Sequence, residues 1–484
     1  MKVHVRISLV VVLIFLFHLT VYGFNPPGEY GQISVKKWAD DRKSAFTFTF
    51  DDGFITQYQY VKPILDSFGF RGTFFVISGS MTDDLPGIWR YGTWNQFGSM
   101  ANEGHEIGSH TVTHPYLTTL SNGDVRTPGT LLYELSQSRN TIEQKITNQK
   151  CISIAYPYFE YNTNVKNETA LFYEGGRGGS NVPMDASLAA GGFYSIGGKE
   201  EQFSTPRNST QDDLDELQNF ESYEDSAITL EKWGMLVAHE VYPFSQITDS
   251  LLQVAWYPMS TEWLTSFCQW LKQRSDSNEV WVETMGNVIR YMKERDQFQY
   301  YVIAQTDTQI QINANDSLPD PIYNYPLTVD ITVPADWEGA LITQGSRTDT
   351  TNTLVEGSIA YVRTKIIPDG GNIILNKRVK PTGVEKVKSA LRIYTLEQNY
   401  PNPFNPITRI KYTIPVESNV RVIVFNALGE SIKDLVNEIK GAGVYEVSFS
   451  SSGIAIGVYF YSIVANSTDG KQSFTKTGKM VVMK

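Results

Sequence analysis

The segment Ala45-Phe46-Thr47-Phe48-Thr49-Phe50-Asp51-Asp52-Gly53 holds the pattern that decides the fold. The apolar and β-branched run from Ala45 to Phe50 predicts a buried strand. Two carboxylates and a glycine follow at once, which is typical of a turn at a strand end. Because neighbouring side chains of a strand point in opposite directions, we expect Asp51 and Asp52 to have different roles.

A second segment, His110-Thr111-Val112-Thr113-His114-Pro115, brings two imidazoles four residues apart. That spacing would place both on one face of a helical turn. An Asp-Asp-Gly triplet alone is more often a plain turn, and a lone histidine is more often structural. One carboxylate and two histidines together give three ligands for a catalytic divalent metal with an open position.

The residues around these segments predict an α/β fold. Apolar runs at 45–50, 72–77, 106–109, 152–155, 234–238 and 280–283 alternate with helical periods at 61–68, 94–102, 131–146, 263–274 and 285–295. Such alternation favours a parallel sheet, closed as a barrel. Residues 160–232 interrupt the rhythm with Gly175–Gly179 and the acidic stretch 212–224. We interpret them as barrel elements with long surface loops that determine specificity.

Beyond Gln299 the pattern becomes all-β. Strand-like runs at 300–303, 308–312, 327–333, 340–342 and 359–365 are separated by turn signals, which predicts a small sandwich over 299–388. Short strands recur again from Leu396 to Lys484. A chain ending near Gln299 is expected to contain the whole barrel and to be active.

Composition excludes some classes of partner. Lys plus Arg is 41 and Asp plus Glu is 52 among 484 residues, a net charge of −11. This argues against nucleic acid or an anionic membrane surface. The apolar run Leu9–Phe17 after Lys2 and Arg6 predicts a signal peptide over 1–23, and no later run is long enough for a transmembrane segment. Cys151 and Cys268 are expected to be two buried thiols rather than a disulfide.

The Asp-Asp and His-x-x-x-His segments resemble the polysaccharide deacetylases, the NodB-homology family or carbohydrate esterase family 4, over about Ser44 to Met292. The resemblance implies a distorted (β/α)7 barrel over 24–298. It also implies one divalent metal, Zn²⁺ first and Co²⁺, Ni²⁺ or Fe²⁺ as possibilities, held by Asp52, His110 and His114. That metal would polarise the acetyl carbonyl and activate water.

The same resemblance implies roles for further residues. Asp51 would be the base, and the backbone N–H of Tyr158, after Tyr156-Pro157, would bind the oxyanion beside Pro157. Leu236 would wall the acetyl pocket and His239 would be the general acid, tuned by a carboxylate such as Glu283 or Asp66. The arginine that usually steadies the base would fall at Ala155. Arg177 could replace it within ion-pair reach of Asp51, or could be solvated and unpaired.

The tail resembles the sorting domain of the type IX secretion system. The resemblance rests on Asn399-Tyr400-Pro401-Asn402-Pro403-Phe404-Asn405-Pro406 and on the closing Lys479-Met480-Val481. It implies a β-sandwich over 396–484, partnership with the secretion machinery, and a secreted or cell-surface protein. An ordinary adhesion-type β domain is the alternative.

Three functions stay open at this stage. The first is an N-deacetylase acting on amino-sugar polymers such as chitin, peptidoglycan or poly-N-acetylglucosamine. The second is an O-acetyl esterase acting on xylan or a similar glycan. The third is a catalytically silent glycan-binding surface protein.

Overall fold

The computed structural model describes residues 30–83, 90–188, 190–200, 210–378 and 393–483. The chain divides into two compact units, 1–378 and 379–484, which are described separately. The expected signal peptide, 1–23, lies outside the described residues. None of the described helices combines the length and apolar character needed to cross a bilayer.

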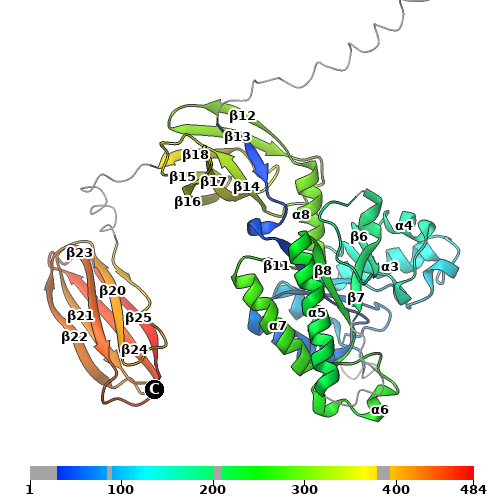
Figure 1. The fold of residues 1–484 in the computed structure, drawn as a ribbon, viewed down its shortest axis with the longest axis horizontal. Helices are drawn as coiled ribbons and strands as arrows, with labels where there is room; N and C mark the ends of the chain where they lie inside the picture. Colours follow the sequence, from blue (N-terminus) through cyan, green and yellow to red (C-terminus); the bar gives the residue numbers. More distant parts are fainter. Residues whose placement is uncertain (1–29, 84–89, 189, 201–209, 379–392, 484) are drawn as a thin grey trace, which may run out of the picture. The chain divides into compact units, whose positions relative to one another are not determined.

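Seven parallel strands form a closed barrel in the first unit (Figure 1). They follow the chain in order, and β2 pairs with both β3 and β8, so the sheet has no free edge. A further parallel strand, β11 (Val280–Val282), pairs with the first half of β2. The barrel strands are β2 (Ser44–Phe50), β3 (Gly72–Val76), β4 (Glu106–Ser109), β5 (Ser153–Ala155), β6 (Gly175–Gly179), β7 (Ile196–Glu200) and β8 (Trp233–Ala238). The expected seven-stranded α/β barrel is therefore confirmed.

Helices connect these strands and cover the barrel. They are α1 (Lys62–Phe68), α2 (Trp94–Asn102), α3 (Leu131–Lys145), α4 (Thr163–Thr169), α5 (Thr210–Leu230), α6 (Asp249–Leu252), α7 (Thr261–Asp276) and α8 (Met285–Gln297). A capping box between Thr93 and Gln96 starts α2, and Gly69 in the left-handed conformation ends α1. The outward residues Phe46, Phe48 and Phe50 of β2 belong to the large apolar cluster that also includes Phe267 of α7.

The glycine-rich stretch at 175–179 is the strand β6, one of the barrel elements expected within residues 160–232. Its glycines are needed because aromatic rings press against the backbone. A Cβ on Gly176 would lie 2.2 Å from the Tyr156 hydroxyl, and one on Gly178 would lie 2.5 Å from the Tyr161 ring. A search for apolar runs misses this strand because four of its five residues are glycines, which leave space for the neighbouring aromatic rings. The acidic stretch 212–224 lies within α5.

The middle β module takes a strand from before the barrel. β1 (Ile33–Val35) pairs antiparallel with β14. Strand β16 bends between two sheets, because its first half pairs with β15 and its second half with β17. The strands of the module are β12 (Gln299–Gln305), β13 (Gln309–Asn315), β14 (Leu327–Thr332), β15 (Gly339–Gln344), β16 (Arg347–Glu356), β17 (Ile359–Ile366) and β18 (Ile373–Arg378).

One apolar core joins this module to the barrel. Trp281 of β11 and Tyr291 of α8 belong to the same buried cluster as Ile310 of β13 and Val329 of β14. Polar contacts add to it: the Tyr325 hydroxyl donates to Glu283, and the Tyr325 N–H donates to Glu294. Barrel and middle module are therefore one packed unit.

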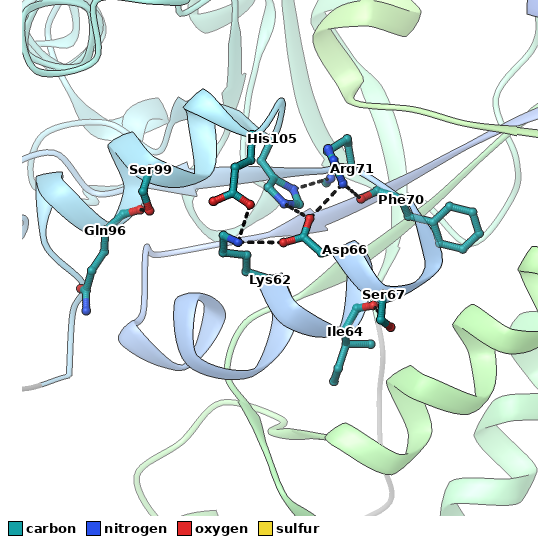
Figure 2. Close-up of polar contacts among 11 residues, drawn as sticks. Lys62, Ile64, Asp66, Ser67, Phe70, Arg71, Gln96, Ser99 and His105 are labelled. Atoms are coloured by element: carbon teal, nitrogen blue, oxygen red, sulfur yellow. Dashed lines mark hydrogen bonds and ion pairs between the residues drawn. The ribbon is translucent and has the colours of Figure 1, made fainter. Parts of the chain in front are cut away.

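A polar cluster joins the amino-terminal ends of the barrel strands β3 and β4 (Figure 2). The Asp66 carboxylate accepts from Lys62 and Arg71, and it contacts His105 Nε2 at 3.2 Å. The Gly72 N–H donates to His105 Nδ1, so the Nε2 of the neutral ring carries the proton toward Asp66. This engagement places Asp66 at the opposite end of the barrel from the Asp51 turn. Asp66 is therefore not the partner of His239 that the sequence allowed.

The second unit is a two-sheet β-sandwich. One sheet has the order β19-β20-β23 and the other β22-β21-β24-β25. The strands are β19 (Thr395–Leu396), β20 (Ile407–Ile414), β21 (Ser418–Phe425), β22 (Ser431–Lys440), β23 (Gly443–Ser450), β24 (Gly457–Ser467) and β25 (Ser473–Val482). Asn402 bonds to the Lys479 carbonyl and the Val481 N–H, so the two sequence signatures of the tail lie side by side.

Three smaller points complete the fold. A π-helical turn (Gln57–Val61) precedes α1, and short strands β9 (Val241–Tyr242) and β10 (Met259–Ser260) pair after β8. Short 3₁₀ turns lie at 39–41, 117–119, 157–159, 190–194 and 244–246. Both cysteines are free and buried, which confirms the expectation of two thiols.

Candidate active site

The candidate residues gather where barrel strands end. Asp51 and Asp52 follow β2, His110 follows β4, Tyr158 follows β5 and His239 follows β8. All these positions lie at the carboxyl ends of parallel strands, where barrel folds build their sites.

Asp52, His110 and His114 converge on one point. Asp52 Oδ1 lies 3.5 Å from His110 Nε2 and 3.7 Å from His114 Nε2, and the two imidazole nitrogens lie 3.1 Å apart. Among the described residues this is the group of three whose ligand atoms all lie within 4.8 Å of one another.

The donor atoms fit a metal ion. His110 Nδ1 lies 2.8 Å from the Ala155 carbonyl, which fixes the proton on Nδ1 and leaves the lone pair of Nε2 facing the cluster. The Asp52 Oδ1 atom is buried and has no hydrogen-bond partner within the described chain. Burial, followed by the charge of His110, lowers the pKa of His114 to about 4, so this ring is neutral near pH 7. Two imidazoles and a carboxylate of this kind suit Zn²⁺ and related divalent ions.

Backbone strain brings these ligands together. Asp52 has φ 72°, Thr111 has φ 68° and His114 has φ 59°, all in the left-handed region that L-residues rarely adopt. The 110–114 segment is therefore a tight irregular turn, and the helical turn that we expected there is wrong. The His114 N–H donates to the Thr111 hydroxyl inside this turn. Such strain concentrates at functional sites.

Asp51 faces the barrel interior and pairs with Arg177. Arg177 Nη2 lies 2.5 Å from both Asp51 carboxylate oxygens, and both side chains are buried. The prediction that Arg177 lies within ion-pair reach of Asp51 is confirmed. The strand register explains it, because Arg177 on β6 is the direct partner of Ala155 on β5. The arginine that was expected at position 155 of β5 is therefore replaced by one on the neighbouring strand β6.

This pairing determines the charge of Asp51. Burial raises the pKa of the carboxyl, but the opposing charges of Arg177, His110 and His239 outweigh burial and hold the pKa below its ordinary value. Asp51 is therefore a carboxylate near neutral pH. His239 directly follows β8, and its carbonyl accepts from the Gln57 side chain, which also donates to the Asp51 carbonyl.

Two buried side chains that sequence reasoning missed hold the site's backbone. Glu134 of α3 accepts the N–H groups of Val112 and Thr113 at 2.8 and 2.9 Å, inside the histidine turn. Gln57, in the π-helical turn, donates to the carbonyls of Asp51 and His239. Neither position stands out in a sequence, since their function depends on contacts distant along the chain.

The remaining predicted residues are placed as follows. Tyr158 has φ 59°, its ring lies 4.6 Å from that of His114, and the preceding Pro157 is buried. Leu236 lies in the outer apolar cluster, whereas its neighbour Val237 lies on the Arg177 side of β8, near Gly198. Glu283 accepts from Tyr325, Thr284 and Asn287, which places it at the middle module rather than beside His239.

Comparison with known proteins agrees with this geometry. Residues 39–172 match the sequence profile of the polysaccharide deacetylase family, and residues 398–477 match that of the secretion system C-terminal sorting domain.

Individual relatives share about 30% sequence identity with this chain over part of its length. A gellan lyase of a Bacillus species is 28% identical over 362 residues, which cover 72% of this chain and 13% of that protein. A chitin deacetylase of Arthroderma benhamiae is 31% identical over 128 residues, 25% of this chain and 30% of that protein. The Streptococcus pyogenes deacetylase PplD, solved in complex with acetate, is 30% identical with a TM-score of 0.26, covering 31% of this chain and 62% of that one.

The chain thus spans less than a third of the length of these two curated relatives. The profile matches, by contrast, fall on the barrel that carries the Asp-His-His cluster and on the sandwich that joins the two tail signatures. This chain carries a polysaccharide deacetylase domain of carbohydrate esterase family 4 and, at its carboxyl end, a type IX secretion system sorting domain.

Proposed function

We propose that this chain is a secreted, metal-dependent deacetylase that hydrolyses the N-acetyl groups of an amino-sugar polysaccharide. The observation that carries the proposal is the unpartnered Asp52 oxygen facing two imidazole nitrogens, one residue from a buried carboxylate paired with arginine. A silent binding protein has no need to keep such a costly arrangement.

Asp52, His110 and His114 would hold the metal. When bound, a divalent ion there would supply Lewis acidity to the acetyl carbonyl and to a water. Asp51 is ionised and fixed by Arg177, so it can accept the proton of the attacking water. The backbone N–H of Tyr158 would donate to the oxyanion, and His239 would protonate the leaving amine. Pro157 would support a wall of the acetyl pocket, whereas Leu236, which lies in the outer apolar cluster, would only pack behind the strand β8.

Metal analysis and acetate release test the proposal together. The purified chain should contain about one divalent ion per molecule and release acetate from chitin oligomers or peptidoglycan. His110→Ala should lose both the ion and activity, because one of three ligands is gone. Full metal occupancy in that variant would refute the ligand assignment.

The choice of substrates decides between the alternatives. Acetate released from acetylated xylan but not from amino-sugar polymers would identify an O-acetyl esterase. Gellan belongs in the same assay because one relative carries its name. Binding of glycans with no release of acetate would favour the silent surface protein.

We also propose that the tail directs export through the type IX machinery, to the medium or the cell surface. A sorting-domain profile over 398–477 supports this proposal. A chain that lacks 393–484 should accumulate in the periplasm of its native host. Normal surface delivery of the shortened chain would contradict the proposed role.

A further inference from the structure

Two exposed tyrosines stack beside the metal ligands. The rings of Tyr116 and Tyr158 lie 3.9 Å apart at an interplanar angle of 11°, and each residue is 48% exposed. Single exposed aromatics are common on protein surfaces and need no explanation. A parallel pair of exposed rings in contact with a candidate metal ligand is different, because it presents a flat apolar face next to the reacting centre.

The backbone is strained to hold these rings in place. Tyr158 and Phe159 are consecutive left-handed residues, with φ 59° and 58°. The result is that Phe159 packs against the Arg177 guanidinium while the Tyr158 ring meets His114 and stays exposed. The carbonyl of Tyr116 accepts from the N–H and the hydroxyl of Thr119, which fixes the start of the next turn. A purely structural role does not require an exposed pair of rings built at this cost.

Polar groups border the aromatic face. Thr118, two residues after Tyr116, donates its hydroxyl to Glu160, two residues after Tyr158. A pyranose ring has the matching chemistry, with an apolar face of C–H groups and an edge of hydroxyls. Aromatic rings with polar neighbours suit ligands of this type.

We propose that the Tyr116–Tyr158 pair is a binding subsite for a pyranose ring adjacent to the sugar that carries the acetyl group. This inference rests on the proposed function and deepens it: the preferred substrate is an oligosaccharide or polymer rather than a single acetylated sugar. Tyr116 is the specificity-determining residue, since its ring forms the outer member of the pair that contacts His114 through Tyr158.

Kinetics on two substrate lengths test the subsite. The metal-loaded chain and its Tyr116→Ala variant are compared on the N-acetylglucosamine tetramer and on the monomer. Loss of one aromatic face should raise KM for the tetramer roughly three- to tenfold, with a much smaller change for the monomer. Tyr116→Phe keeps the stacked ring and should restore the low KM.

Controls separate binding from structural damage. Tyr301→Ala removes a similarly exposed tyrosine from β12, far along the chain from the site, and should leave KM for both substrates unchanged. Metal content must be the same in the wild-type and Tyr116→Ala chains. A fall in metal content, or an equal change for tetramer and monomer, would overturn the subsite.

Failure of the proposed function would look different. If the wild-type chain released no acetate from either saccharide, the deacetylase proposal would fail while the subsite could still be judged. Retention of wild-type and Tyr116→Ala chains on insoluble chitin would then decide it: weaker retention of the variant supports the subsite, and equal retention rejects it.

Discussion

Asp51 and Asp52 show how two identical neighbours acquire different chemistry. Asp51 continues the pleat of β2 into the barrel and meets a guanidinium, whereas the left-handed φ of Asp52 turns its side chain toward two imidazoles. The sequence predicted this division from alternation along the strand. It could not predict the backbone strain that produces it, because nothing in an Asp-Asp-Gly triplet specifies a positive φ at the second aspartate.

The position of Arg177 was open in the sequence and is settled by register. Because position 155 is alanine, the sequence allowed Arg177 either to pair with Asp51 or to be solvated and unpaired. Only the pairing of β5 with β6, which sets Ala155 opposite Arg177, shows that the positive charge lies on β6 instead of β5. Glu134 and Gln57 were not predicted at all, since each is an ordinary helix residue until the fold brings a remote backbone against it.

Replacing Arg177 tests the buried pair. Arg177→Met should leave Asp51 buried without its partner, at a cost of about 3–5 kcal/mol in the free energy of unfolding. Deacetylation should fall with it, because the carboxylate loses both its orientation and its charge stabilisation. Chemical denaturation and acetate release measure the two effects. Arg139→Met, which removes an arginine of α3 whose side chain is 27% exposed, is the matched control and should change little. Unchanged stability in Arg177→Met would show that the pair is unimportant.

At the scale of elements, helix α3 supports the histidine turn. Its Glu134 carboxylate accepts from two backbone N–H groups and from the Thr113 hydroxyl, so a surface-covering helix holds the backbone between His110 and His114. The sequence predicted α3 to within a residue. The helical turn that was expected between the histidines was wrong. The segment, which the structure describes throughout, has no helical backbone hydrogen bonds and is held by the Glu134 carboxylate from α3 and by the Thr111 hydroxyl.

Glu134→Gln should therefore weaken metal binding without unfolding the barrel. The amide keeps one oxygen for the two backbone N–H groups, but it loses the negative charge that strengthens these hydrogen bonds and the second oxygen that accepts from the Thr113 hydroxyl. Loss of such outer support typically costs tenfold or more in metal affinity. Calorimetric titration of the metal-free chain with Zn²⁺ measures the effect. Glu143→Gln changes a carboxylate on the same helix that pairs with Arg139 and Lys150, and it should bind Zn²⁺ as the wild type does. Equal affinities for both variants would contradict this role of Glu134.

The elements at the other end of the barrel are joined by a buried histidine. Burial lowers the pKa of His105 to about 4, although the negative charge of the neighbouring Asp66 opposes this shift (Figure 2). In the unfolded chain His105 has its ordinary pKa of about 6.5. As the pH falls, His105 is therefore protonated in the unfolded chain before it is protonated in the folded chain. Stability contributed by neutral His105 is thus complete above pH 6.5 and is lost progressively down to about pH 4.

His105→Gln removes this titration while leaving a side chain that can bond to Gly72 and Asp66. Between pH 7 and pH 4.5 the wild-type chain should lose about 2 kcal/mol more in the free energy of unfolding than the variant. Urea denaturation at the two pH values gives the comparison, and the contribution of His114 cancels because both chains carry it at the other end of the barrel. The same pH dependence in both chains would show that His105 is not the titrating group.

The whole molecule joins its parts differently from what the sequence suggested. The barrel, the middle module and the tail were visible as changes of period, and their fold classes were predictable because strand and helix patterns are local. The shared core between barrel and middle module was not predictable, since it depends on β1 crossing to β14 and on Trp281 and Tyr291 facing the module. A change in the period of the hydrophobic pattern shows that helices give way to strands. It does not show that the two parts fold independently.

Truncated chains test whether the barrel folds without the middle module. A chain ending at Gln299 would expose the shared apolar cluster and would leave Glu294 without the Tyr325 N–H. We therefore expect that chain to aggregate or to unfold well below the temperature of the full protein, contrary to the sequence-based expectation of an active barrel. A chain ending at Arg378 keeps the complete first unit and should retain Zn²⁺ binding and acetate release. Thermal melts and activity of the two chains decide the matter. A stable, active chain ending at Gln299 would show that the middle module only covers the barrel and does not complete its core.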